Sequence, residues 1–270
     1  MTRLPFRTAA LATVGGVGNA AVVLALYARA EYPTLESTVG LAAPVFAVGL
    51  VAVLVSASTR LVAPTVGFLA ALIGTTYVEL TSPMPECGEL RGYVVVDGPT
   101  YVADYANAWY VWLSLALVAG LLEFAIRRGY GIADGRLRNL PAFPLSRTAI
   151  AGTVAGFAGF VGIATALLVL RAGIRPPLAA LVVFAAAAAV TAVPLRALLA
   201  RGLLSPVLLF AVVVPYFLIV EVFVATDSPV HLVLFGSYAV VLSLVGALEA
   251  AFRSRIRGWS GGRFVGERPR

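Results

Sequence analysis

The 270-residue chain contains no lysine, one cysteine (Cys87) and one histidine (His231). Without lysine it cannot form the Schiff base that retinal or pyridoxal phosphate requires. One cysteine excludes a disulfide within the chain, and one histidine argues against a bis-histidine haem or a multi-histidine metal site. We therefore expect no cofactor and no metal ion.

Charged side chains are also scarce. They make up 12% of the residues, against 60% hydrophobic residues, and the mean hydropathy is +0.95. These values exceed those of soluble domains and are typical of a multi-pass membrane protein. Because the arginines lie in short loops between apolar runs, the net charge of +7 does not predict a nucleic-acid partner. The lysine-free, alanine-rich and arginine-rich composition is typical of a high-GC prokaryote, and the acidic outer loop would suit a haloarchaeon.

Known catalytic motifs are missing as well. The sequence has no H-E-x-x-H, no G-x-S-x-G, no phosphate-binding P-loop and no dinucleotide fingerprint. We therefore expect a protein that is not an enzyme.

The apolar runs predict an all-α integral membrane protein with eight transmembrane helices, each long enough to cross about 30 Å of hydrocarbon. Sixteen of the twenty arginines fall on one side if the N-terminus is cytoplasmic. The positive-inside rule then places both termini in the cytoplasm of a cell-membrane protein. The predicted spans are 8–28, 38–58, 61–80, 105–126, 148–170, 177–199, 203–225 and 229–252.

The longest loop, residues 81–104, is acidic and is expected outside. Its sequence RGYVVVDGPTYVAD predicts a short β-hairpin that turns at Asp97-Gly98. Aromatic residues follow at Tyr101, Tyr105, Trp109, Tyr110 and Trp112, which predicts an aromatic belt at the outer interface. The loop is interpreted as an anchored cap or, alternatively, a ligand site, and Cys87 within it has no assigned role.

Three sequence blocks occur twice in the same order. RTAxxxTVxG begins at Arg7 and Arg147, PxxxF(x₉)VE at Pro64 and Pro206, and GxLExAxR at Gly120 and Gly246. We interpret them as a tandem duplication: a four-helix repeat at 1–140, a parallel second repeat at 141–257, and a basic cytoplasmic tail at 258–270. Parallel repeats are related by a pseudo-two-fold axis along the membrane normal.

Small residues predict close helix packing in the first helix of each repeat. They recur at four-residue spacing in both helices. The residues are Ala12, Gly16 and Ala20 in one helix, and Gly152, Gly156, Ala158 and Gly162 in the other.

Ionisable residues at membrane depth are candidates for function because each costs several kcal/mol unless it is paired. Two of the glutamates precede an arginine by four residues near the inner helix ends, which is the favourable order for an ion pair. We interpret these pairs, Glu123–Arg127 and Glu249–Arg253, as structural anchors, with a gate or relay as the alternative.

Glu79 and Glu221 lie instead near outer helix ends, with no basic residue within a turn. His231 and Glu221 are at similar depth on either side of a turn, so they could meet and exchange protons or simply link two helices. Asn19 is expected to bond between helices, and Pro215 predicts a mobile or discontinuous helix.

These features lead to two main hypotheses and a less favoured third, a membrane enzyme built around Glu79, Glu221 and His231. The first is a carrier of a small solute or ion, linked to protons, with Glu79, Glu221 and His231 near the pseudo-two-fold axis. The second is a non-catalytic accessory or scaffold subunit that binds a membrane-protein partner or another copy of itself within the lipid bilayer.

Overall fold

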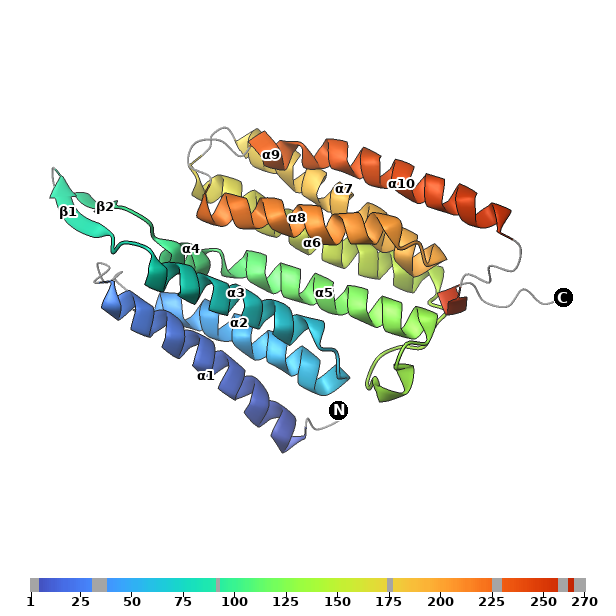
Figure 1. Ribbon diagram of the computed structural model, residues 1–270, viewed down its shortest axis with the longest axis horizontal. Helices are drawn as coiled ribbons and strands as arrows, with labels where there is room; N and C mark the ends of the chain where they lie inside the picture. Colours follow the sequence, from blue (N-terminus) through green and yellow to red (C-terminus); the bar gives the residue numbers. More distant parts are fainter. Residues whose placement is uncertain are drawn as a thin grey trace. The chain divides into compact units, whose positions relative to one another are not determined.

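The computed structural model describes residues 5–30, 38–90, 93–173, 177–224, 230–256 and 262–264. The helices are named in chain order together with two strands and two 3₁₀ turns (Figure 1). The elements are α1 (Phe6–Arg29), α2 (Thr38–Thr59), α3 (Ala63–Thr81), β1 (Glu86–Leu90), β2 (Tyr93–Asp97), α4 (Tyr101–Asn107), α5 (Trp109–Tyr130), η1 (Asp134–Arg136), α6 (Arg147–Arg171), α7 (Pro177–Arg201), α8 (Ser205–Phe223), α9 (Val230–Val233), α10 (Phe235–Arg255) and η2 (Gly262–Phe264).

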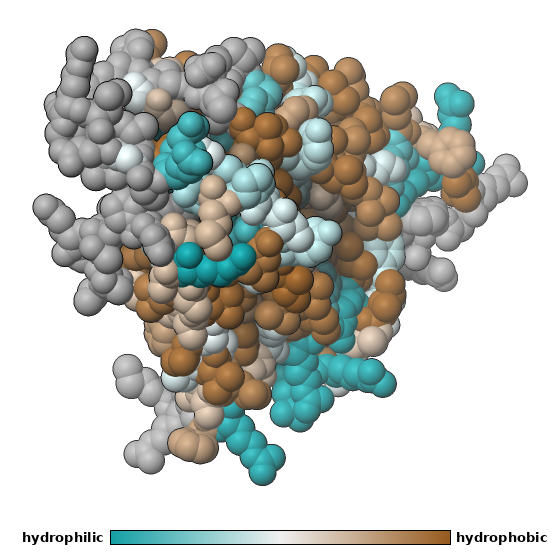
Figure 2. Space-filling model, turned by 60° about the vertical axis from the view of Figure 1, so that its left-hand side comes forward, coloured by the Kyte–Doolittle hydropathy of each residue, from teal (hydrophilic) through white to brown (hydrophobic). Residues whose placement is uncertain are grey.

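Within the described residues, eight helical segments are long and apolar enough to cross a membrane. Each overlaps one of the eight runs expected from the sequence. Hydrophobic side chains cover much of the surface that Figure 2 presents, as expected for helices that face lipid. The chain is therefore all-helical in its membrane-spanning part.

The fourth and eighth spans are interrupted near one end. A break at Ala108 separates α4 from α5, and a break at Leu234 separates α9 from α10. The sequence predicts the discontinuity elsewhere, in the helix that contains Pro215. The expected discontinuity is wrong, since α8 runs unbroken through Pro215, whereas the expected mobility stays a prediction.

The outer loop contains two paired strands. β1 and β2 are antiparallel, with Glu86 opposite Asp97 and Leu90 opposite Tyr93. Asp97 and Gly98 therefore end the second strand and do not form the turn that the sequence predicts. Gly98 has a positive φ of 110°, as a glycine in a turn often does. Here, however, Gly98 connects the end of β2 to α4. The side chain of Cys87 lies outside the described part.

Two compact units divide the chain, Met1–Leu117 and Val118–Arg270. In the first, α1 packs along α2 at a glycine contact. A Cβ atom at Gly16 would lie 2.7 Å from the Phe46 ring and 2.9 Å from the Phe46 carbonyl oxygen. Only glycine therefore permits the two backbones to approach this closely.

In the second unit, α6 packs along α7 and α10 packs on the same helix. The α6–α7 contact also places a glycine against a phenylalanine, because a Cβ atom at Gly162 would lie 2.9 Å from both the ring and the carbonyl oxygen of Phe184. At Gly152 and Gly156, by contrast, a Cβ atom would meet nothing within 4 Å. The prediction that these two glycines belong to the packing face is therefore wrong.

The turns α2–α3 and α7–α8 have the same local geometry. Arg60 and Gly202 have φ angles of 62° and 66°, respectively. The residues before the next helices, Val62 and Leu204, have φ/ψ of −100°/−36° and −99°/−35°. Each following helix carries a proline in its first turn, where the missing N–H costs nothing.

Candidate functional site

Glu221 and His231 meet near the end of α8. Nε2 of His231 lies 2.8 Å from Oε2 of Glu221, and their side chains are 21% and 6% exposed. Neither atom has an aligned hydrogen-bond partner among the described residues, so we treat the pair as a close contact with unfavourable orientation. The separation of 2.8 Å is within the range of a hydrogen bond, whereas the orientation is not.

Aromatic rings surround this pair. Phe217 precedes Glu221 by one helical turn, and its ring stacks on His231 with centroids 5.6 Å apart. Phe235 and Tyr238 also contact the Phe217 ring. His231 lies on α9 and stacks on Phe217 of α8. Its position therefore depends on how α9 joins α10 at Leu234.

Glu79 occupies the corresponding end of α3 but has a different partner. Its Oε2 accepts a hydrogen bond of 3.0 Å from the backbone N–H of Val102, near the start of α4. A carboxylate at this position satisfies an N–H group that the first turn of a helix leaves unpaired. The sequence did not predict this contact. Every residue except proline has a backbone N–H group, so the residue type does not reveal which one donates.

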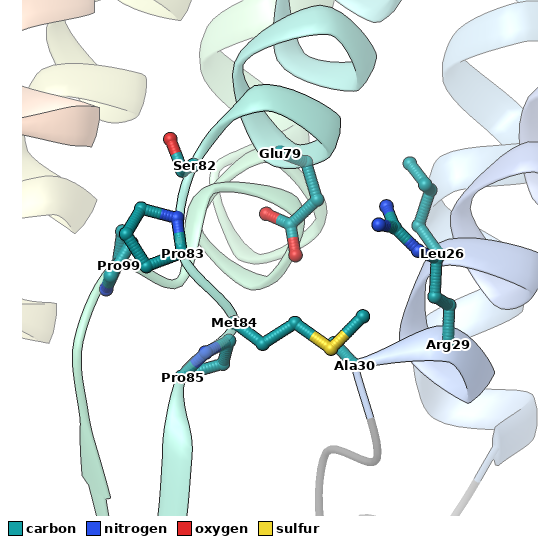
Figure 3. A pocket seen from close by; sticks show the side chains of 9 residues that line it. All are labelled: Leu26, Arg29, Ala30, Glu79, Ser82, Pro83, Met84, Pro85 and Pro99. Carbon is teal, nitrogen blue, oxygen red and sulfur yellow. The ribbon is translucent and has the colours of Figure 1, made fainter.

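A small pocket adjoins Glu79. Its lining includes Arg29, Met84 and Pro99, and its volume is about 10 Å³. Figure 3 shows the Glu79 carboxylate and the Arg29 guanidinium on opposite sides of this space. The volume suffices for about one water molecule.

Asn19 links three helices of the first unit. Its amide nitrogen donates to the carbonyl of Val45 at 2.6 Å, and its oxygen accepts from the Tyr105 hydroxyl at 3.1 Å. The Tyr105 hydroxyl is buried and donates to Asn19, so Tyr105 acts as a fixed donor between the helices.

This arrangement corrects the expected aromatic belt. Tyr105, Tyr110 and Trp112 are only 1%, 9% and 5% exposed. The indole N–H of Trp112 donates to the backbone oxygen of Tyr105, and the two rings stack. Aromatic residues at a helix end are ambiguous, because the same polar tip can face water or find a partner inside the protein.

Both predicted inner ion pairs form. Arg127 lies 2.8 Å from Glu123, and Arg253 contacts Glu249. Glu249 also accepts hydrogen bonds from the backbone N–H groups of Leu204 and Ser205 at 3.2 and 2.8 Å. It thus caps the start of α8 as well as anchoring the arginine.

A second charged cluster, which the sequence did not predict, lies just after α5. Asp134 accepts hydrogen bonds from Arg128 and Arg263. Desolvation tends to raise the pKa of Asp134, but these two arginines outweigh it and hold the pKa below its usual value of 3.8. The adjacent Phe264 ring packs over Gly129 and Gly202, where an added methyl group would overlap it.

The described residues contain no group of three or more histidine, cysteine, aspartate or glutamate side chains able to hold a metal ion. Glu221 and His231 are two ionisable side chains in close contact, whereas Glu79 accepts a backbone hydrogen bond. No family model matches the chain, and neither a curated protein nor a solved structure is significantly similar to it.

Proposed function

We propose that this multi-pass protein is a proton-linked carrier of a small solute or ion. The observation that carries the proposal is the contact of 2.8 Å between Glu221 and His231, on two different helices. Within a membrane an ionisable pair is costly to maintain, and a carboxyl–imidazole pair changes its charge when it gains or loses one proton.

The break between α9 and α10 supplies a means of coupling. His231 lies on the short α9 segment, whereas α10 continues as the long membrane-spanning helix. A change in charge of the pair alters the attraction between α8 and α9, and the response is proposed to begin at Leu234, the single turn residue between α9 and α10. Leu234 keeps helical φ/ψ angles of −64° and −12°, so a small displacement of α9 does not require the span to break.

The proposed architecture comprises two parallel four-helix repeats, 1–140 and 141–257, and a cytoplasmic tail, 258–270. The matched geometry of the α2–α3 and α7–α8 turns supports the duplication. So do the two glycine–phenylalanine contacts, Gly16 with Phe46 and Gly162 with Phe184. The arginine distribution supports cytoplasmic termini and a place in the prokaryotic cell membrane.

The contacts of α1 and α6 favour a different alignment from the one that their sequences suggest. RTAxxxTVxG pairs Gly16 with Gly156, whereas the packing pairs Gly16 with Gly162. Buried positions follow the same shift, since Ala12, Asn19 and Val23 then correspond to Ala158, Thr165 and Val169. We therefore propose that α1 and α6 correspond with Gly16 matched to Gly162, as the residues at their helix contacts indicate.

The experiment is solute uptake into proteoliposomes under an imposed pH gradient. The probes are radiolabelled amino acids, organic acids, ammonium analogues and divalent cations, tested one at a time. We expect Glu221→Gln and His231→Gln to lower the coupled uptake at least tenfold and Glu79→Gln to lower it less. Glu123→Gln is the matched control. Uptake that is unchanged by both Glu221→Gln and Glu79→Gln would contradict the proposal.

The second candidate is a non-catalytic accessory or scaffold subunit. It is favoured by Glu79, whose contact with Val102 serves as a helix cap and whose adjoining pocket holds only about 10 Å³. In native membranes, chemical cross-linking should then trap a constant partner or a second copy. A protein that is always recovered as a lone monomer would exclude this function.

A further inference from the structure

The second unit contains a wide groove at the ends of its helices that lie far from Glu221. It lies between α6 and α10 with α7 as its floor, and its volume is about 1050 Å³. Its apolar wall consists largely of short side chains, including Ala151, Ala155, Ala197 and Ala200. Alanine side chains are short, so they leave space for an occupant. Longer side chains would fill that space.

Three arginines stand at the rim of this groove, Arg147, Arg196 and Arg201. All three are exposed, and no hydrogen bond or ion pair to any of them is found among the described residues. In the part of the chain that the structure describes, no acidic residue lines the groove. Ser243, the one uncharged polar side chain in the lining, donates its hydroxyl to Ala239 of its own helix.

Along α6 the groove has a charged end and an apolar end. Arg147 is the first residue of α6, and Ala155 lies about 12 Å farther along the helix at 1.5 Å per residue. On α7, Ala197 and Ala200 lie between Arg196 and Arg201, and Ala192 and Val193 continue the apolar lining away from the helix end. In a bilayer, Arg147 and Arg201 at the helix ends lie at headgroup level, whereas Ala155 and Ala192 lie deeper. The site joins an anion-binding end to an apolar channel.

We propose that this groove binds an anionic phospholipid, with the phosphate on the arginines and one acyl chain along the alanine wall of α6 and α7. Basic pockets between transmembrane helices are suited to acidic lipid headgroups. The forked guanidinium group matches a phosphate oxygen pair, and the apolar wall gives a lipid an advantage over free phosphate. This binding does not depend on the carrier function.

The test is native mass spectrometry of the full-length protein in detergent, titrated with phosphatidylglycerol or phosphatidylcholine of equal chain length. We expect phosphatidylglycerol to bind more tightly. Each substitution Arg147→Gln, Arg196→Gln or Arg201→Gln should weaken its binding about fivefold, the effect of about 1 kcal/mol for each basic residue near a membrane surface. The triple variant should lose the preference for phosphatidylglycerol.

A matched triple variant provides the control. Arg136→Gln, Arg138→Gln and Arg255→Gln remove the same charge from arginines that do not line the groove, and should leave the preference intact. Ala197→Trp fills the channel with all arginines retained and should weaken phosphatidylglycerol binding at least tenfold. The proposal is overturned if both triple variants weaken binding equally, if inorganic phosphate competes as well as lipid, or if Ala197→Trp abolishes a dimer instead of lipid binding.

Discussion

The two units repeat the same backbone devices but place different polar groups on them. In the first unit, Asn19 bonds to Val45 and Tyr105, three groups that stay uncharged at physiological pH. In the second, the polar contact between helices is Glu221 with His231, which a single proton can alter. The first unit thus links its helices through uncharged groups, whereas the second brings two ionisable side chains together.

The largest effect is expected at the helix–helix glycines. Gly16→Ala and Gly162→Ala should each lower the free energy of unfolding by about 2–3 kcal/mol, because the added methyl group meets a backbone carbonyl that cannot rotate away. Denaturation in mixed micelles would measure this. Gly156→Ala is the control and should be neutral or stabilising, since its methyl group would meet nothing within 4 Å. If Gly156→Ala lowered the free energy of unfolding as much as Gly16→Ala, the sequence alignment that pairs Gly16 with Gly156 would be favoured instead.

The next effect concerns Asn19. Asn19→Ala leaves the buried Tyr105 hydroxyl without its acceptor, so the free energy of unfolding should fall by about 2 kcal/mol. Thr165→Ala at the proposed equivalent position should cost less than about 1 kcal/mol, because the Thr165 hydroxyl donates only to Val161 of its own helix. Equal losses in urea or SDS titrations would remove the distinction between the units.

A smaller effect is expected at the inner end. Glu249→Gln keeps one oxygen for the start of α8 but loses the charge that pairs with Arg253, at a cost of about 1 kcal/mol. Hydrogen exchange of the Leu204 and Ser205 amides should accelerate. Glu123→Gln is the matched control and should leave these two amides unchanged, whereas equal acceleration by both variants would show that the capping effect is not local.

The smallest effect is expected at Asp134. Because its folded pKa lies below 3.8, its bonds to Arg128 and Arg263 stabilise the fold at neutral pH and are lost as the pH falls through that lowered value. Limited proteolysis around residue 263 should therefore quicken only below about pH 3.8. Asp134→Asn should show the fast rate at every pH, and unchanged protection in that variant would contradict the assignment.

The number of spans was predictable because long apolar runs are a strong, local sequence property. The meeting of Glu221 and His231 was also predictable, since both lie the same distance from one turn. The Asn19–Tyr105 contact was not, because its partners are 86 residues apart and nothing in the sequence selects one hydroxyl from many. The prediction that Gly156 packs against another helix was wrong for a related reason. In a helix rich in small residues, a match in residue type does not show which face of the helix packs.

The turn at Arg60 has a consequence for how the protein enters the membrane. Arg60 has a left-handed backbone, which costs a side-chain-bearing residue about 1–2 kcal/mol, whereas the matching turn uses Gly202. Glycine would suit the finished fold better at both places. In the proposed orientation, however, Arg60 is the one positive charge in the short α2–α3 turn. In that orientation, a positive charge in the turn favours its retention on the cytoplasmic side while the nascent chain is inserted, a role that glycine cannot perform.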